Sequence, residues 1–359
     1  MQTTHRIRFG DARAEMTGIA ADSVDLIVTS PPYPMIAMWD EAFAGLNPSI
    51  RRALEAEDGL RAFEAMHAEL DRIWREAFRV LKPGGLACVN IGDATRTIGG
   101  EFQLYPNHAR ILQAALALGF TSLPDILWRK PTNSPTKFMG SGMLPAGAYV
   151  TYEHEYVLIL RKGGKRRFQS AAEKRRRRES AFFWEERNTW FSDLWTDLNG
   201  TGQEMRGKEA RTRSAAFPFE LAFRLVLMHS AYGDLVLDPF LGTGTTSAAC
   251  VAAGRESLGI EIDPSLCPAI GQALRQAVEI GKSRAAERIA DHVAFVEKRR
   301  ARGKTIRYTN RPHRFGVMSA QEQDLIIRAP ERLARTGEDT FRAEYAAAVP
   351  REDLVLFEP

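Results

Sequence analysis

Short apolar segments of β-forming residues alternate along this chain with longer segments whose apolar residues recur every three to four positions. Strands are predicted at 6–10, 25–30, 86–92, 121–128, 155–162, 235–240 and 257–262, and helices at 60–81, 106–118, 217–231 and 245–254. Such alternation is typical of a mostly parallel sheet with helices on both faces. The chain is therefore predicted to be an α/β protein with one main core.

One segment interrupts this alternation. From about Arg161 to Thr212 the sequence is rich first in basic residues, then in aromatic residues and finally in glycine and polar residues. We interpret it as an insertion into a single sheet-based domain, because regular alternation resumes after it. The predicted organisation is a first half over 1–161, an insertion over 162–214, a second half over 215–280 and a helical extension over 281–359. The Pro-, Gly- and Ser-rich stretch between Trp128 and Glu153 is predicted to be a long loop.

The stretch LVLDPFLGTGTT predicts a tight turn between a strand and a helix. The strand ends at Asp238, Gly242 and Gly244 allow a ligand to approach the backbone closely, and the helix begins at Thr245. Free N–H groups at such a turn bind anions. Glu261 ends the next strand, at about the 20-residue spacing at which an acidic side chain contacts a ribose in nucleotide-binding folds.

Taken alone, this turn is also compatible with an ordinary strand-to-helix connection. Together with the acidic strand end, it predicts a pocket for an adenosine-containing cofactor. The chain has neither the three-glycine dinucleotide fingerprint nor a Gly-Lys-Ser or Gly-Lys-Thr phosphate loop. S-adenosyl-L-methionine therefore fits better than a dinucleotide or a nucleoside triphosphate.

A second loop, TSPPYPM at 29–35, follows the predicted strand at 25–30. Its two consecutive prolines, Pro31 and Pro32, stop the strand and fix the backbone, so that a carbonyl group points outward with little conformational entropy left to lose. The same pattern also occurs by chance, in strands that simply end at a proline. Its occurrence ahead of the glycine turn, in this order, favours a catalytic loop.

These two motifs resemble those of the DNA amino-methyltransferases, which methylate exocyclic amines of cytosine or adenine. FGDA, RVLKPGG, YEHEYVLILRKG and FPFELAFRLV add to the resemblance, which covers roughly residues 5 to 280. The catalytic motif precedes the cofactor motif, as in the beta group, whose target recognition region lies between them. The resemblance implies a Rossmann-like S-adenosylmethionine-dependent methyltransferase fold, and a target recognition region at 162–214.

The resemblance also implies roles for individual residues. Ser30 and the Pro31 carbonyl would accept hydrogens of the target amine, and Tyr33 would stack on a base extruded from the duplex. The cofactor contacts that it implies are Asp11, Asp238, Phe240, Gly242, Gly244, Thr245 and Glu261. The alternatives are that Asp11 and Thr245 only cap a turn or helix, and that Phe240 only packs in the core.

The target base is predicted from the resemblance alone. Serine in the first position of the catalytic motif goes mainly with cytosine N4, whereas Asp or Asn goes mainly with adenine N6. Methylation at ring carbon 5 needs a cysteine nucleophile, and none of Cys88, Cys250 and Cys267 follows a proline. We therefore expect an N4-specific enzyme; the alternatives are an adenine-N6 enzyme, a protein or RNA methyltransferase, and a non-catalytic DNA-binding protein.

The charge distribution predicts a polyanionic partner. The net charge is only +4, but eleven Lys and Arg residues against four Glu lie between Arg161 and Arg187. Within a methyltransferase insertion we expect such a run to contact DNA phosphates, although a solvated face is the commoner fate of charge runs. The predicted contacts are Lys174, Arg175, Arg176, Arg177 and Arg178.

The remaining expectations concern setting and partners. The three cysteines are too few for a disulfide framework or a thiolate metal site, so we expect a reducing environment, no metal and small buried thiols. No leader or apolar span is apparent, and the expected compartment is the cytoplasm. Expected partners are double-stranded DNA and a cognate restriction endonuclease; the recognition sequence and the oligomeric state stay open.

Overall fold

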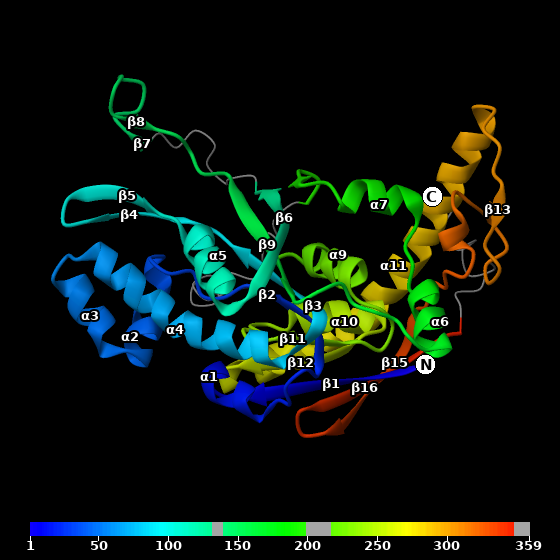
Figure 1. Cartoon of the computed structure of the whole chain (residues 1–359), viewed down its shortest axis with the longest axis horizontal. Coiled ribbons are helices and arrows are strands. Elements are labelled where there is room, and N and C mark those ends of the chain that lie inside the picture. The colour runs from blue at the N-terminus through cyan, green and yellow to red at the C-terminus, as the bar shows by residue number, and fades with distance from the viewer. Residues whose placement is uncertain (131–138, 199–216, 348–359) are drawn as a thin grey trace.

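The computed structural model describes residues 1–130, 139–198 and 217–347. In these residues a ten-stranded sheet runs through the centre of the molecule, with helices on both of its faces (Figure 1). Its strands, from one edge to the other, are β10 (Leu194–Trp195), β6 (Phe120–Arg129), β9 (His154–Lys162), β3 (Leu81–Ile91), β2 (Val24–Thr29), β11 (Leu235–Asp238), β12 (Glu256–Glu261), β1 (Gln2–Phe9), β16 (Thr340–Tyr345) and β15 (Pro330–Gly337).

The centre of this sheet is parallel. Strands β3, β2, β11, β12 and β1 all run in one direction, whereas β9 and β16 run antiparallel to their neighbours. The predicted α/β architecture with a mostly parallel central sheet is confirmed. Because the central strands are parallel, the loops that follow them meet at the same edge of the sheet, here called the carboxyl edge.

Two layers of helices cover the sheet. Helices α1 (Ala12–Glu15), α4 (Gly59–Val80) and α5 (Asn107–Leu118) pack on one face, and α9 (Phe219–His229), α10 (Thr245–Ala253) and α11 (Cys267–Ala301) on the other. Successive residues of β3 alternate between the layers, as the pleat requires: Ala87 and Val89 face α4, and Cys88 faces α9. Cys88 and Cys250 are fully buried, as predicted for small apolar side chains, whereas Cys267 is only partly buried and the prediction is wrong for it.

The four predicted helices correspond to α4, α5, α9 and α10. Helix α4 begins after Asp58, whose side chain accepts a hydrogen bond from the Arg61 N–H, and α5 ends at Gly119 with φ of +101°. The structure adds α2 (Asp40–Leu46), α3 (Pro48–Glu55) and two hairpins, β4 (Ala94–Ile98) with β5 (Glu101–Tyr105) and β7 (Met139–Gly140) with β8 (Ala148–Tyr149). The last hairpin lies in the predicted long loop, of which 131–138 are outside the described residues.

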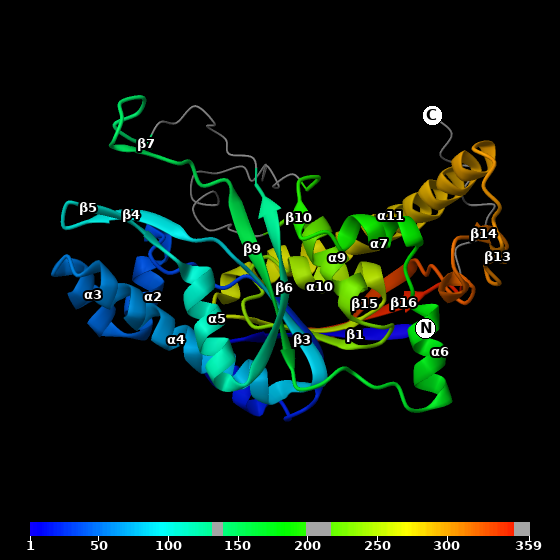
Figure 2. The ribbon, with the colours of Figure 1, turned by 45° about the horizontal axis from the view of Figure 1, so that its top comes forward.

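Residues 162–198 of the predicted insertion pack against the main core. They form α6 (Ala171–Glu179), α7 (Trp184–Trp190) and strand β10, which pairs with β6 and extends the central sheet. Trp190 and Trp195 are buried among residues of α9 and β6, and Figure 2 shows α7 beside α9 and the long α11. These two tryptophans therefore pack the insertion against the core. The rest of the insertion, 199–214, lies outside the described residues.

The prediction of a helical extension over 281–359 is wrong for residues 302–347; residues 348–359 lie outside the described residues. Helix α11 ends at Ala301, and β13 (Tyr308–Thr309), β14 (Gly316–Val317), β15 and β16 follow. Strand β16 pairs with β1 and buries Phe341, Ala343 and Tyr345 at every second position. This period of two is the signal for a strand that the prediction overlooked. Within the described residues no helix is both long and apolar enough to cross a bilayer.

A buried polar contact ties α7 to this C-terminal part. His292 of α11 is fully buried, stacks on Phe183 with ring centroids 3.9 Å apart, and contacts the Glu185 carboxylate through Nδ1 at 2.6 Å. Its Nε2 donates to the Gly316 carbonyl oxygen at 2.9 Å. The contact thus joins segments more than 100 residues apart in the chain.

Replacing His292 by Ala should lower the free energy of unfolding by about 3–5 kcal/mol, because it leaves the Glu185 carboxylate without its partner. Urea denaturation of the whole chain measures this loss. The matched control is Glu297→Gln, since Glu297 is exposed and pairs only with Arg300 on the same helix, and such pairs contribute about 0–1 kcal/mol. Equal losses in both variants would contradict the role of this contact.

Candidate active site

The proline loop and the glycine turn lie side by side at the carboxyl edge. Strands β2 and β11 are neighbours and parallel, with Leu26 opposite Val236 and Ile27 opposite Leu237. Ser30 therefore begins its loop next to the point where Asp238 begins the glycine turn. Two motifs separated by more than 200 residues are brought together by strand pairing alone.

Asp238 joins the two motifs chemically. Its Oδ1 accepts hydrogen bonds from Thr29 Oγ1 at 2.6 Å and from the Phe240 N–H at 3.0 Å, and its Oδ2 accepts one from Thr246 Oγ1 at 2.6 Å. Only 2% of the residue is exposed. Burial raises the pKa of this carboxyl group to about 6, against the opposing effect of its hydrogen bonds. Asp238 thus connects the end of β2 with the start of α10 through hydrogen bonds. The sequence prediction did not assign a role to Thr29 or Thr246.

Tyr33 is held by a hydrogen-bond network that the sequence prediction missed. Its hydroxyl donates to Glu155 Oε2 at 2.9 Å and accepts hydrogen bonds from Asn90 Nδ2 at 2.9 Å and from Ser30 Oγ at 3.1 Å. Asn90 Nδ2 also donates to Glu155 Oε2, and Lys130 donates to Glu155 Oε1. Burial, then the Glu155 charge, raises the pKa of Tyr33 well above its usual value.

Asn90 and Glu155 could have been found in the sequence. Both are polar residues within predicted apolar strands, LACVNIG and EYVLILRK, where a polar side chain needs a specific partner. Asn90 is 1% exposed and Glu155 is 9% exposed. The Asn90 Oδ1 atom is buried and has no hydrogen-bond partner among the described residues, so it is available to a donor from a ligand.

The glycine turn has the conformation that its sequence requires. Gly242 and Gly244 adopt φ of +55° and +93°, values that favour glycine. No atom lies within 4 Å of the position that a Cβ of Gly242 would take, so space is open there. Gly244 precedes the first turn of α10 without any side-chain cap, and Thr245, partly exposed, is the first helical residue. The alternative that Thr245 caps the helix is therefore wrong.

Glu261 lies at the adjacent strand end and faces this turn. Its carboxylate accepts hydrogen bonds from the Gly242 N–H at 2.7 Å and the Asp263 N–H at 2.9 Å. Burial raises its pKa, although these hydrogen bonds oppose the shift. Each carboxylate oxygen keeps a lone pair for a further donor, such as a ribose hydroxyl.

Asp11 and Phe240 complete the predicted cofactor set. Asp11 caps α1 and binds the Arg13 guanidinium, and these hydrogen bonds lower its pKa although burial alone would raise it. Its carboxylate is thus already engaged, as the capping alternative described. Phe240 is half-buried and meets the ring of Trp74 edge-on, with centroids 6.2 Å apart. The Trp74 Nε1 atom is buried without a partner among the described residues.

These residues fit an adenosine-containing cofactor with a carboxylate. Open space at Gly242, the N–H groups at the start of α10, and the acidic group of Glu261 at the next strand end provide sites for an anion and for hydroxyl groups. No basic side chain of the described residues is placed in this turn to neutralise phosphates, which agrees with a cofactor that has none.

The predicted DNA contacts lie elsewhere. Helix α6, with Lys174 to Arg178, lies near the start of β1, whereas the catalytic loops follow the ends of the strands (Figure 1). Arg176 contacts Asp234, the residue just before β11. A six-residue strand such as β2 spans about 20 Å. The structure therefore does not bring this basic run together with Ser30 and Tyr33.

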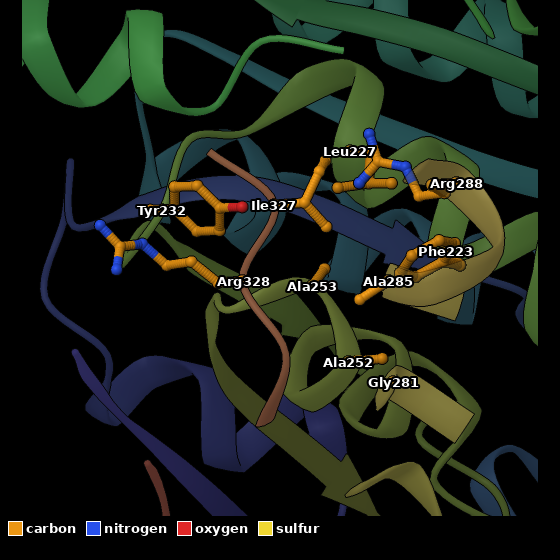
Figure 3. A pocket seen from close by; sticks show the side chains of 10 residues that line it. All are labelled: Phe223, Leu227, Tyr232, Ala252, Ala253, Gly281, Ala285, Arg288, Ile327 and Arg328. Atoms are coloured by element: carbon orange, nitrogen blue, oxygen red, sulfur yellow. The ribbon is translucent and has the colours of Figure 1, made fainter. Parts of the chain in front are cut away.

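Two other features of the described residues are separate from this site. Glu185, His292 and Glu322 could offer one metal-ligand atom each within 4.8 Å of one another, but His292 already bridges Glu185 and the Gly316 carbonyl group. The cavity in Figure 3 lies between α9, α10, α11 and the segment at Ile327. Its volume of about 10 Å³ is room for about one water molecule, so it cannot hold a cofactor.

The buried Asp238 predicts a specific pH dependence. Its pKa is about 6 in the folded protein and about 3.9 in an unfolded chain. The folded state therefore binds this proton more tightly, so the contribution of Asp238 to stability falls as pH rises from 4 to 7. The stability advantage of the wild type over Asp238→Asn should shrink by roughly 2 kcal/mol across this range, as measured by urea denaturation; a difference that does not change with pH would contradict it.

Comparisons with known proteins agree with this site. A family model described as DNA methylase, of the N6/N4 methyltransferase type, matches residues 24–272, which include both motifs. The Type II methyltransferase M.MthZI of Methanothermobacter thermautotrophicus is 48% identical over 354 residues, covering 98% of both chains. M.MjaI of Methanocaldococcus jannaschii is 48% identical over 279 residues, covering 75% of this chain and 90% of that protein.

Solved structures agree as well. TTHA0409 of Thermus thermophilus, in complex with S-adenosyl-L-methionine, has a TM-score of 0.59 and 34% identity, covering 76% of this chain and 96% of that one. The PvuII cytosine-N4-specific DNA methyltransferase shares the fold, with a TM-score of 0.53 and 18% identity over 78% of this chain and 93% of that one. With both motifs meeting at one edge of the sheet, the chain belongs to the N6/N4 family of DNA amino-methyltransferases, and its cofactor is S-adenosyl-L-methionine.

Proposed function

We propose that this DNA methyltransferase methylates the exocyclic N4 amine of cytosine within a specific duplex sequence, on a base extruded from the helix. The observation that carries this proposal is a hydroxyl group, Ser30 Oγ, at the start of the catalytic loop next to the glycine turn. When bound, S-adenosyl-L-methionine supplies an electrophilic methyl group. The chain's own residues must then bind the base and remove a proton from its amine.

The amine is a poor nucleophile because its lone pair is delocalised into the ring. Acceptors for its hydrogens let the nitrogen become tetrahedral as the new bond forms. We assign this task to Ser30 Oγ and the Pro31 carbonyl oxygen. Ser30 donates its own proton to the Tyr33 hydroxyl, so its oxygen keeps lone pairs with which to accept an amine hydrogen.

Tyr33 has two tasks in this proposal. Its ring stacks on the extruded base, and its hydroxyl fixes the ring through Glu155 and Asn90. The same contacts form a continuous route for a proton: from Ser30 Oγ to the Tyr33 hydroxyl and on to the Glu155 carboxylate. Lys130 donates a hydrogen bond to the other oxygen of Glu155, so both carboxylate oxygens are oriented. Pro32 keeps the backbone between Ser30 and Tyr33 rigid.

The contacts with the cofactor stay proposals residue by residue. We assign the methionine carboxylate to the turn of Gly242, Gly244 and Thr245, and the ribose to Glu261. Asp238 acts by holding the turn against Thr29. We assign Asp11 and Phe240 to the adenine ring. Asp11 would contact the ring while its carboxylate is bound to Arg13.

The target duplex approaches the carboxyl edge in this proposal, because the extruded base must reach Ser30. Strand β10 ends at this edge, whereas α6 does not reach it. Sequence recognition is therefore assigned to the end of the predicted insertion, 194–214, of which 199–214 lie outside the described residues. The names of the relatives as Type II methyltransferases support a further proposal, that a restriction endonuclease of the same specificity accompanies this enzyme.

The target base can be tested directly. DNA incubated with the protein and S-adenosyl-L-methionine should contain N4-methylcytosine, detected by mass spectrometry of its nucleosides. The matched control is the Ser30→Ala protein, which should yield far less. N6-methyladenine would show an adenine enzyme with an atypical serine, and absence of any methyl transfer would leave a non-catalytic DNA-binding protein on this scaffold.

The two tasks of Tyr33 can be separated by paired variants. Tyr33→Ala removes the stacking ring and should lower kcat/KM by a factor equivalent to about 1–3 kcal/mol. Tyr33→Phe keeps the ring but loses the hydrogen bonds to Ser30 and Glu155, so it should bind DNA like the wild type and lower kcat. Single-turnover methylation and DNA binding measure the two effects. Unchanged turnover in both variants would remove Tyr33 from the mechanism.

A further inference from the structure

The basic run of the insertion lines an open groove at the edge of the sheet opposite the active site. The groove has a volume of about 1290 Å³ and is lined by the loop after β9, by α6 and α7, and by the C-terminal end of α9. Its cations are Arg161, Lys165, Arg166, Lys174, Arg177, Arg178 and Arg187. The only acidic residue among the described lining residues is Glu322, which is 2% exposed and whose oxygens accept the Trp184 and Ser319 N–H groups.

Helix α6 divides the predicted contacts into two sets. Lys174, Arg177 and Arg178 are three and four residues apart, so they share one face of the helix, and this face lines the groove. Arg175 pairs with Glu179 on another face, and Arg176 with Asp234 at the sheet. Neither Arg175 nor Arg176 lines the groove, so only part of the run is directed at it.

The groove cations are largely uncompensated. Arg166 and Arg178 have carboxylate partners, in Asp234 and Asp324. Among the described residues, Lys165, Lys174 and Arg187 have no carboxylate partner and are exposed. Phe168 lies between the guanidinium groups of Arg166 and Arg177, at 4.7 and 4.9 Å from its ring centroid. The Phe168 ring thus holds both cations in place without neutralising them.

We propose that this groove binds the phosphate backbone of a second DNA segment while the carboxyl edge holds the target duplex. Charge complementarity favours a nucleic acid: among the described lining residues every exposed charged side chain is basic, and regularly spaced phosphates release counterions when such cations cover them. An acidic polypeptide is the alternative occupant, which the test must exclude. The two sites lie at opposite ends of strands about 20 Å long, so one enzyme would join two segments of DNA.

The test is capture of a second duplex. The protein is bound with S-adenosyl-L-methionine to immobilised DNA that it methylates, and retention of a fluorescent duplex without that sequence is measured. The groove variant is Lys165→Gln, Lys174→Gln and Arg187→Gln together. The matched control, Arg6→Gln, Arg332→Gln and Arg342→Gln, removes the same charge from exposed residues on β1, β15 and β16.

We expect the groove variant, and not the control, to lose about tenfold or more in capture of the second duplex. The salt dependence of that capture should fall in slope by up to about 0.9 for each lost phosphate contact. Binding of the immobilised DNA should persist. The proposal would be overturned if the groove variant captured the second duplex as well as the wild type does, or if the control variant lost as much capture as the groove variant.

Two further outcomes would also overturn it. If the groove variant loses the immobilised DNA as well, the groove holds the target duplex itself. If poly-glutamate displaces the second duplex from the wild type more effectively than unlabelled DNA does, the occupant is an acidic polypeptide. None of these results depends on which base is methylated, so failure here is separate from failure of the N4 proposal.

Discussion

The hydrogen bonds of Asp238 connect the two halves of the active site. Thr29 precedes the catalytic serine and Thr246 lies in the first turn of α10, and both donate to this one buried carboxylate. Pairing of β2 with β11 brings the strands together, and this contact joins the two loops beyond their ends. A buried carboxylate costs free energy, and three hydrogen bonds offset part of that cost, since the pKa of Asp238 stays raised in spite of them. The same hydrogen bonds hold the catalytic loop against the cofactor turn.

The network around Tyr33 extends the same principle to the catalytic loop. The two prolines limit the backbone, but the ring is oriented by Glu155 and Asn90, which belong to β9 and β3. The loop is thus fixed by strands on one side and by the Asp238 contact on the other. Preorganised acceptors at this place need not rearrange when the amine loses its proton, which suits a reaction without a strong base.

The basic residues of the insertion have several roles at once. Some neutralise carboxylates at the starts of the central strands, as Arg166 does with Asp234. Others, such as Lys174, have no partner among the described residues and face a groove. A run of like charges in a sequence therefore does not describe one surface, because a helix distributes successive residues over different faces.

The sequence by itself determined the alternation of strands and helices, the two loops at the ends of β2 and β11, and the residue types Ser30, Tyr33 and Glu261. These depend on local periodicity, proline and glycine, which act within a few residues. It did not determine the strands β15 and β16, the packing of Trp190 and Trp195 in the core, or the partners Asn90, Glu155 and Thr246. Their positions depend on contacts between segments tens to hundreds of residues apart. Local signals exist, such as the period of two in β16 and the polar residues within apolar strands, but they do not identify the partners in those contacts. The tertiary structure alone placed Lys174 to Arg178 at the opposite edge from Ser30, because strand direction, and not sequence distance, sets the end of the sheet at which a loop emerges.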